Sequence, residues 1–292
     1  MRADMRHITS LTYDAPVTTS YTELRLRPAE TPTQHVISSS LVVRPGVRAL
    51  RYADADGTNV DVVEVHEPHT LLWVEARATT ETRGPAQSEG PGWAELDETA
   101  RRGPWFQWLL PSRYVTPGAH PELGEIVRAG RSPAEGFSSL CATVQKRFAF
   151  VPTVSFVGRS VAHLIEQGQG VCQDFVHYVL HGLRAAGVPA RYVSGYLAEA
   201  DRQVTAEASH AWVEVVWPGG GTLALDPTNG VEAGEAHIRI GAGADYDTVA
   251  PMRGIYFGEG EQSLDVRVEL RAADTFELAQ LHQRQAASPA QQ

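Results

Sequence analysis

A cysteine, a histidine and an aspartate are the residues of this chain whose types and spacing best fit covalent catalysis. Cys172 follows a glycine-rich turn, and His210 and Asp226 lie further along in alternating apolar stretches. A thiolate can attack a carbonyl carbon, an imidazole can take the thiol proton, and a carboxylate can hold the imidazole in the required tautomer. Together the three side chains indicate acyl transfer through a thioester.

The sequence around Cys172 predicts a helix that begins close to this residue. Apolar residues recur at helical spacing from 171 to 183, and Gly187 and Pro189 end the pattern. The first turn of a helix carries unpaired N–H groups and a positive dipole end, which favour a thiolate. The backbone N–H of Cys172 is therefore also a candidate donor to the oxyanion, and the preceding glycines allow backbone to approach a substrate carbonyl.

A β-hairpin is predicted to bring His210 and Asp226 together. Two strand-like stretches, 208–217 and 222–226, flank the turn sequence of residues 218–221. The midpoint between His210 and Asp226 falls within this turn, so the two side chains should be neighbours across antiparallel strands. Each residue alone has a structural interpretation, and the catalytic hypothesis depends on the combination.

Two aromatic residues are candidates for lining the acyl site. Trp212 shares a strand face with His210 by two-residue alternation, and Tyr196 lies on the preceding strand, 190–197. Aromatic residues on sheet faces are more often part of the core. Cys141, on the apolar face of a helix predicted to start at Ser132, is expected to be a core residue.

A metal site is the alternative raised by His177 and His181, which are spaced i, i+4 on the predicted helix. No glutamate-containing metalloprotease pattern accompanies them, so packed or exposed histidines are the simpler interpretation. The segment 245–247 lacks the oxygen-rich loop of a calcium site. We expect neither a cofactor nor a metal.

Composition excludes several classes of partner. The 292 residues include 25 Lys and Arg against 35 Asp and Glu, a formal net charge of −10, without a dense basic run. Nucleic acid and membranes are therefore not expected partners. No signal-peptide core or bilayer-spanning stretch is visible, and two cysteines cannot form a disulfide framework. We predict a cytoplasmic protein.

Four motifs of this chain resemble those of the bacterial transglutaminase-like superfamily. They are GVCQDF at 170–175, ARYVSGYL at 190–197, SHAWVEV at 209–215 and LDPTNG at 225–230. The resemblance implies a Cys-His-Asp triad, which falls on Cys172, His210 and Asp226. One departure is Thr222, where such proteins often carry an aromatic residue.

The resemblance also implies an α+β architecture. Short strands rich in Val, Leu, Tyr and Thr fill residues 6–82 and predict an antiparallel, sandwich-like sheet. Residues 1–100 are thus assigned to a bacterial transglutaminase-like N-terminal β-domain. Residues 101–271 are assigned to a papain-like catalytic core with a closing strand, in which the nucleophile helix packs on an antiparallel sheet. Residues 272–292 are expected to form a polar tail.

The function implied is that of a cysteine peptidase or amidohydrolase, the activity often attributed to bacterial members. Water is the default acceptor of the acyl group, and the expected partner is a peptide, a protein or a small amide substrate. Transfer of the acyl group to an amine is the first alternative. A non-catalytic binding module on the same fold is the second.

Overall fold

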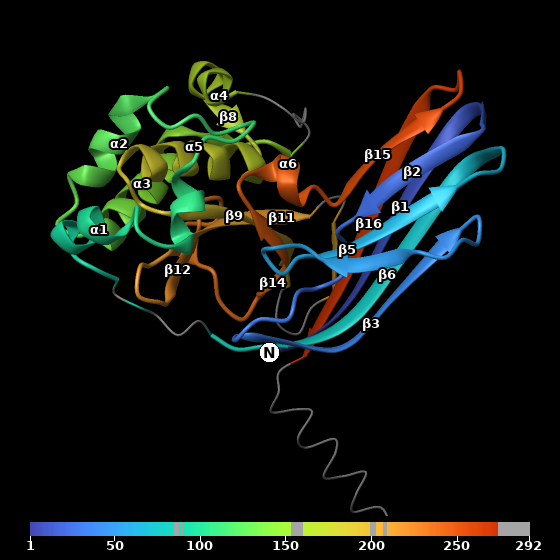
Figure 1. The fold of residues 1–292 in the computed structure, drawn as a ribbon, viewed down its shortest axis with the longest axis horizontal. Coiled ribbons are helices and arrows are strands. Elements are labelled where there is room, and N and C mark those ends of the chain that lie inside the picture. The colour runs from blue at the N-terminus through green and yellow to red at the C-terminus, as the bar shows by residue number, and fades with distance from the viewer. Residues whose placement is uncertain (85–87, 89, 153–159, 199–202, 207–208, 274–292) are drawn as a thin grey trace, which may run out of the picture.

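The protein is described here by a computed structural model that covers residues 1–84, 88, 90–152, 160–198, 203–206 and 209–273. Helices gather around one sheet in one half of the molecule, and long strands form the other half (Figure 1). This is the α+β architecture that the sequence predicts. Among the described residues, no helix is long and apolar enough to cross a membrane.

The N-terminal half consists of strands; side chains of the first two alternate between a buried and a more exposed face, and Leu50–Ala53 is exposed throughout. These strands are β1 (Arg2–Val17), β2 (Thr19–Leu24), β3 (Gln34–Arg44), β4 (Leu50–Ala53), β5 (Asn59–Val65) and β6 (His69–Thr82). They belong to two antiparallel sheets. Residues of β1 and β6 in one sheet share a core with residues of β2 and β5 in the other, as expected for a sandwich.

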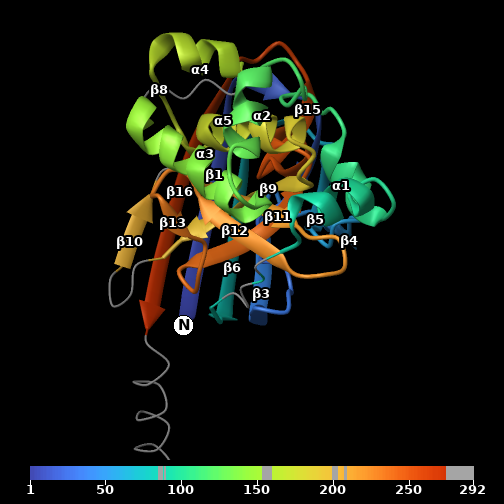
Figure 2. The same ribbon diagram turned by 90° about the vertical axis from the view of Figure 1, so that its left-hand side faces the viewer.

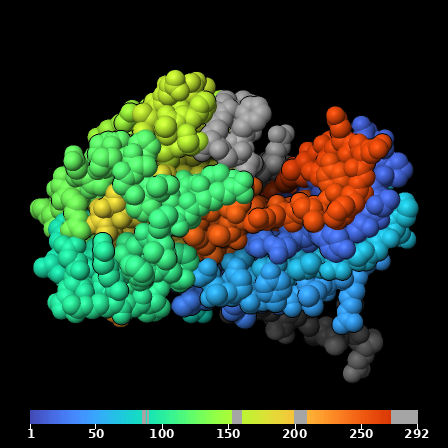
Figure 3. Space-filling view, turned by 45° about the horizontal axis from the view of Figure 1, so that its top comes forward, coloured from blue at the N-terminus to red at the C-terminus, as the bar shows by residue number. Residues whose placement is uncertain are grey.

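The last described strands return to this N-terminal half. β15 (Met252–Phe257) pairs with β2, and β16 (Gln262–Ala273) pairs with β1 along most of its length. The sheet orders are β15-β2-β5-β4 and β10-β16-β1-β6-β3, where β10 is Gln203–Ala206. The strand that the sequence analysis assigns to closing the catalytic core therefore completes the N-terminal sheets instead. Figure 3 shows this orange-red segment running beside both halves.

The second half is built on the sheet β13-β12-β11-β9-β14. Its strands are β9 (Ala190–Leu197), β11 (His210–Val216), β12 (Thr222–Asp226), β13 (Val231–Glu232) and β14 (His237–Gly243). A short parallel pair joins β7 (Ala149–Phe150) to β8 (Gln169–Gly170). The helices are α1 (Trp93–Thr99), the 3-10 helix η1 (Pro104–Leu109), α2 (Pro121–Arg128), α3 (Pro133–Arg147), α4 (Val161–Gln167), α5 (Cys172–Ala185) and α6 (Tyr246–Val249).

Helix α5 is the element that links the helices to the sheet. It packs on β9 and β11 and on the helices α2, α3 and α4 (Figure 2). Its apolar side chains, such as Phe175 and Val179, are almost fully buried in the core that α3 and the sheet complete. This packing places the first turn of α5, which contains Cys172, beside the sheet.

Helix α3 begins as its sequence predicts. The Ser132 hydroxyl accepts a hydrogen bond from the Glu135 N–H at 3.2 Å, and Pro133 is the first helical residue. Cys141 lies on the buried face of this helix. The expectation that this cysteine is a core residue is confirmed.

Candidate active site

Cys172 is the first residue of α5, as predicted, and it is half-buried. The carboxylate of Asp174 accepts a hydrogen bond from the N–H of Val171 at 3.0 Å and caps the helix. Gly168 ends α4 in the left-handed region, at φ 66°. A Cβ on Gly170 would lie 2.8 Å from an Asp174 oxygen. Both glycines thus serve the turn and the cap that set Cys172 in place.

His210 and Asp226 lie at the facing ends of β11 and β12. His210 Nε2 is 2.7 Å from Asp226 Oδ2. The hairpin register, in which Val216 pairs with Thr222, is centred at Gly219. The sequence analysis centres it one residue earlier, so the two side chains meet diagonally rather than directly across the strands.

The Asp226 carboxylate is surrounded by donors. Its side chain is fully buried, and its Oδ1 accepts the N–H groups of Thr228 and Asn229 at 2.9 and 3.2 Å. Oδ2 accepts from the Asn229 side chain at 2.6 Å, in addition to His210. Burial alone would raise the pKa of Asp226, but the hydrogen bonds from His210 and His237 outweigh it and hold the pKa well below its usual range.

The His210 imidazole connects Asp226 to Cys172. Burial alone would lower the pKa of His210, yet its hydrogen bonds with Asp226 and with the Cys172 side chain raise it to about 10. Because Nε2 is engaged by Asp226, Nδ1 is the ring nitrogen left for the thiol. The structure therefore brings the three sequence-predicted residues into one chain of contacts, in which the imidazolium form of His210 is favoured.

The two cysteines differ sharply in environment, and we expect them to differ in reactivity. Burial raises the pKa of the Cys141 thiol far above its ordinary value, and the nearby charge of Asp226 adds to this. Iodoacetamide at about pH 6, below the ordinary thiol pKa of about 8.5, should therefore label Cys172 and leave Cys141 free. Peptide mapping by mass spectrometry measures this. Equal labelling of both cysteines in the folded protein would contradict the site described here.

The two predicted lining residues are both buried. Trp212 is 3% exposed and packs edge-on against His237, with ring centroids 5.1 Å apart. Tyr196 is 2% exposed, and its hydroxyl lies 2.6 Å from Nδ1 of His7 on β1. Tyr196 belongs to the core shared with the N-terminal sheets. Trp212 thus backs the site near His210, whereas Tyr196 is not brought to it.

His177 and His181 each contact a backbone N–H through Nε2, whereas His177 Nδ1 is buried without a hydrogen-bond partner among the described residues. His177 Nε2 accepts the N–H of Tyr246 at 3.3 Å, and His181 Nε2 accepts the N–H of Thr116 at 3.2 Å. Burial lowers the pKa of His177 to about 3 and also lowers the pKa of His181. These histidines therefore fasten two connecting segments to α5 as neutral side chains.

His237 is a site residue that sequence reasoning missed. Its Nε2 lies 3.3 Å from Asp226 Oδ2, on the same oxygen that His210 contacts. One ligand atom each from His210, Asp226 and His237 fall within 4.8 Å of one another, which is close enough for a single divalent cation. In the structure these atoms are joined through hydrogen bonds to the carboxylate. That is the arrangement of a base and its orienting acid.

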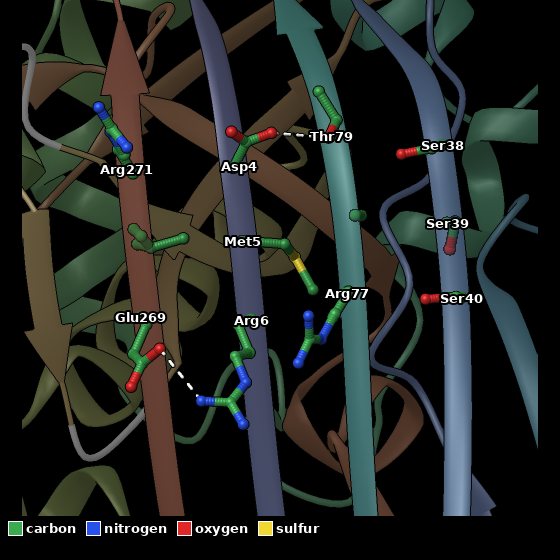
Figure 4. Close-up of a pocket in the computed structure, with 12 residues that line it drawn as sticks. Asp4, Met5, Arg6, Ser38, Ser39, Ser40, Arg77, Thr79, Glu269 and Arg271 are labelled. Atoms are coloured by element: carbon green, nitrogen blue, oxygen red, sulfur yellow. Dashed lines mark hydrogen bonds and ion pairs between the residues drawn. The ribbon is translucent and has the colours of Figure 1, made fainter.

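A hollow of about 520 Å³ lies on the N-terminal half and is lined by β1, β3, β6 and β16 (Figure 4). Among its lining residues, Arg6 contacts Glu269 at 3.3 Å and the Thr79 hydroxyl donates to Asp4. The described residues of its lining include no member of the Cys172 site.

Comparisons with known proteins show which family the chain resembles. Residues 3–81 match the model of the bacterial transglutaminase-like N-terminal region, and residues 123–227 match that of the transglutaminase-like superfamily. The second match contains Cys172, His210 and Asp226. Its extent covers the helices and strands that position all three side chains.

Relatives of similar length extend over nearly the whole chain. An uncharacterized protein of Mycobacterium leprae is 35% identical over 270 residues, covering 90% of this chain and 96% of its own. One from Mycobacterium tuberculosis is 30% identical over 293 residues, covering 92% of each. The crystal structure of a "Putative Cysteine Protease" from Cytophaga hutchinsonii shares the fold, with a TM-score of 0.74, 21% identity, and coverage of 94% of this chain and 93% of that one. The chain belongs to the transglutaminase-like superfamily and carries the bacterial transglutaminase-like N-terminal region.

Proposed function

We propose that this protein is a thiol-dependent acyl-transfer enzyme that hydrolyses an amide, peptide or isopeptide bond. The observation that supports the proposal is the contact chain in which Asp226 holds His210 at 2.7 Å and His210 meets the Cys172 thiol. Cys172 acts as nucleophile, His210 as general base and acid, and Asp226 as the residue that orients His210.

The first half-reaction forms a thioester. The Cys172 sulfur attacks the carbonyl carbon of the substrate amide, and the electron pair of the carbonyl double bond moves to oxygen. The Cys172 backbone N–H, unpaired within the helix because it lies in the first turn, donates to this oxyanion. The C–N bond then breaks, and the His210 imidazolium gives its proton to the leaving amine.

The second half-reaction releases the acid. Neutral His210 takes a proton from water, and the resulting oxygen nucleophile attacks the thioester carbon. A C–O bond forms and the C–S bond breaks, which leaves a carboxylic acid and restores the Cys172–His210 pair. Asp226 stays ionised throughout, since its buried oxygens already accept five hydrogen bonds.

The substrate class that follows from this chemistry is a peptide, a protein or a small amide. We infer that the enzyme works in the cytoplasm, because a reducing compartment keeps free thiols such as Cys141 and Cys172 reactive or unpaired. No cofactor is needed for the two half-reactions, as every proton and electron pair is carried by the triad, the substrate or water.

The acceptor is the part of this proposal that experiment tests most directly. We expect water to resolve the acyl-enzyme, so that an added primary amine diverts little product. The wild-type chain is incubated with a peptide library and a labelled amine in excess, and the products are identified by mass spectrometry. The Cys172→Ala variant serves as the matched control. If amine conjugates outnumber free acids at modest amine concentration, the enzyme is a transamidase, and the hydrolase assignment is wrong.

A further inference from the structure

His237 is a second histidine on the Asp226 oxygen that His210 contacts. It is the first residue of β14, a strand that pairs with β9 and not with the His210 strand, β11. Its side chain is 5% exposed and its Nε2 lies 3.3 Å from Asp226 Oδ2. A strand outside the hairpin thus supplies a further contact to the orienting carboxylate.

The tautomer of His237 follows from its other ring nitrogen. The Gly234 N–H donates to His237 Nδ1 at 3.1 Å, and the His237 N–H donates back to the Gly234 carbonyl at 3.0 Å. Because Nδ1 accepts a hydrogen bond, the ring proton is on Nε2. His237 Nε2–H is therefore a donor aimed at Asp226.

The ring of His237 is also held by packing. The Trp212 indole meets it edge-on at 5.1 Å between ring centroids. Gly195 on β9 makes room for this indole, since a Cβ there would lie 2.5 Å from the Trp212 ring. The hydrogen bond from Gly234 and the contact with the Trp212 ring therefore fix the direction of the His237 Nε2–H donor.

From this geometry we propose that His237 is a positioning residue that holds the Asp226 carboxylate in the orientation that His210 requires. Oδ2 of Asp226 serves both imidazoles, and a second donor on this oxygen restrains the carboxylate from rotating away when His210 changes its protonation. His237 does not touch the substrate or the thiol. Its effect reaches Cys172 only through Asp226 and His210. The inference rests on the proposed function of these three residues.

Two substitutions of His237 by side chains of similar length separate the effect of its hydrogen bond from the effect of its packing. His237→Gln keeps an N–H donor near the position of Nε2, and His237→Met fills the space without one. The readout is the rate at which iodoacetamide alkylates Cys172 at about pH 6, which needs no natural substrate. His237→Met should lower this rate about 10- to 100-fold, the range expected when a hydrogen bond to a charged group is lost. His237→Gln should stay within about threefold of wild type.

A double-mutant cycle with Asp226→Asn tests whether His237 acts through Asp226. We expect the double variant with His237→Met to be no slower than Asp226→Asn alone, because a residue that works only through Asp226 has nothing left to position. Additive losses would overturn the proposal. So would equal losses in the Gln and Met variants, or a wild-type rate in both.

A measurement on the wild-type chain covers the case in which His237→Met does not fold. In ¹⁵N-histidine NMR spectra, the proposal requires the neutral form of His237 to carry its proton on Nε2. A proton on Nδ1 would overturn it. Absence of Cys172 alkylation in the wild type would instead refute the proposed function, so the two failures are distinguishable.

Discussion

Replacing Cys172 with alanine should abolish turnover and leave the fold intact. The sulfur is the only atom lost, the residue is half-buried, and alanine suits the first turn of a helix. Without the sulfur no thioester forms, because no other described nucleophile stands beside His210 in the contact chain. The measurement is turnover of a library peptide that the wild type cleaves.

Stability measurements distinguish a loss of catalysis from a loss of folding. The melting temperature of Cys172→Ala should stay within about 4 °C of wild type, the shift that about 1 kcal/mol produces in a chain of roughly this size. Cys141→Ala is the matched control: it removes a buried sulfur from the core, so it should lose stability yet keep turnover. Wild-type turnover in Cys172→Ala would refute the thiol mechanism.

Local sequence signals predicted the parts of the site that depend on neighbours in the chain. The apolar periodicity after Cys172 and the stop at Gly187 predicted α5, whose first residue is Cys172. Alternating strands flanking a glycine-rich turn predicted the hairpin that carries His210 and Asp226. These signals suffice because helix starts and tight hairpins are set by short-range hydrogen bonding.

The features that sequence reasoning missed depend on contacts distant in the chain. Tyr192 and Tyr196 point to the same face of β9 by alternation, but β9 passes from the helical core into the core of the N-terminal sheets. Tyr196 therefore bonds to His7 and not to a substrate. His237 reaches Asp226 only because β14 pairs with β9, a long-range pairing that a single sequence does not reveal.

The closing strand illustrates the same limit. The sequence analysis assigns a closing strand to the core of residues 101–271, but no local signal shows which sheet such a strand joins. In the structure β15 pairs with β2, and β16 pairs with β1 from Arg2–Ala273 to Tyr13–Gln262. Pairing of this kind depends on a partner strand at the other end of the chain, which local sequence patterns do not reveal.

Asp226→Asn should reduce turnover by about four orders of magnitude, the loss that follows when the carboxylate of a triad becomes an amide. The Asn Oδ1 can still accept the N–H groups of Thr228 and Asn229. Its NH2 group, however, would face His210 Nε2. That nitrogen must then lose its proton and accept a hydrogen bond from the amide. The His210 proton moves to Nδ1, toward the thiol, and the ring can no longer take the proton of Cys172.

The pH dependence of stability gives a second reading of the same substitution. The pKa of His210 is raised to about 10 from an ordinary value of about 6.5, so the folded state favours the imidazolium. This contribution is fully present below about pH 6.5 and is lost as the pH rises through about 10. Asp226→Asn removes one of the two hydrogen bonds that raise the pKa of His210. The wild type should therefore exceed the variant in free energy of unfolding by less at about pH 10 than at about pH 6.5. Thermal melts of both proteins across this pH range measure the difference in stability. A difference that stays constant or widens with pH, or unchanged turnover in the variant, would show that Asp226 only shapes the turn.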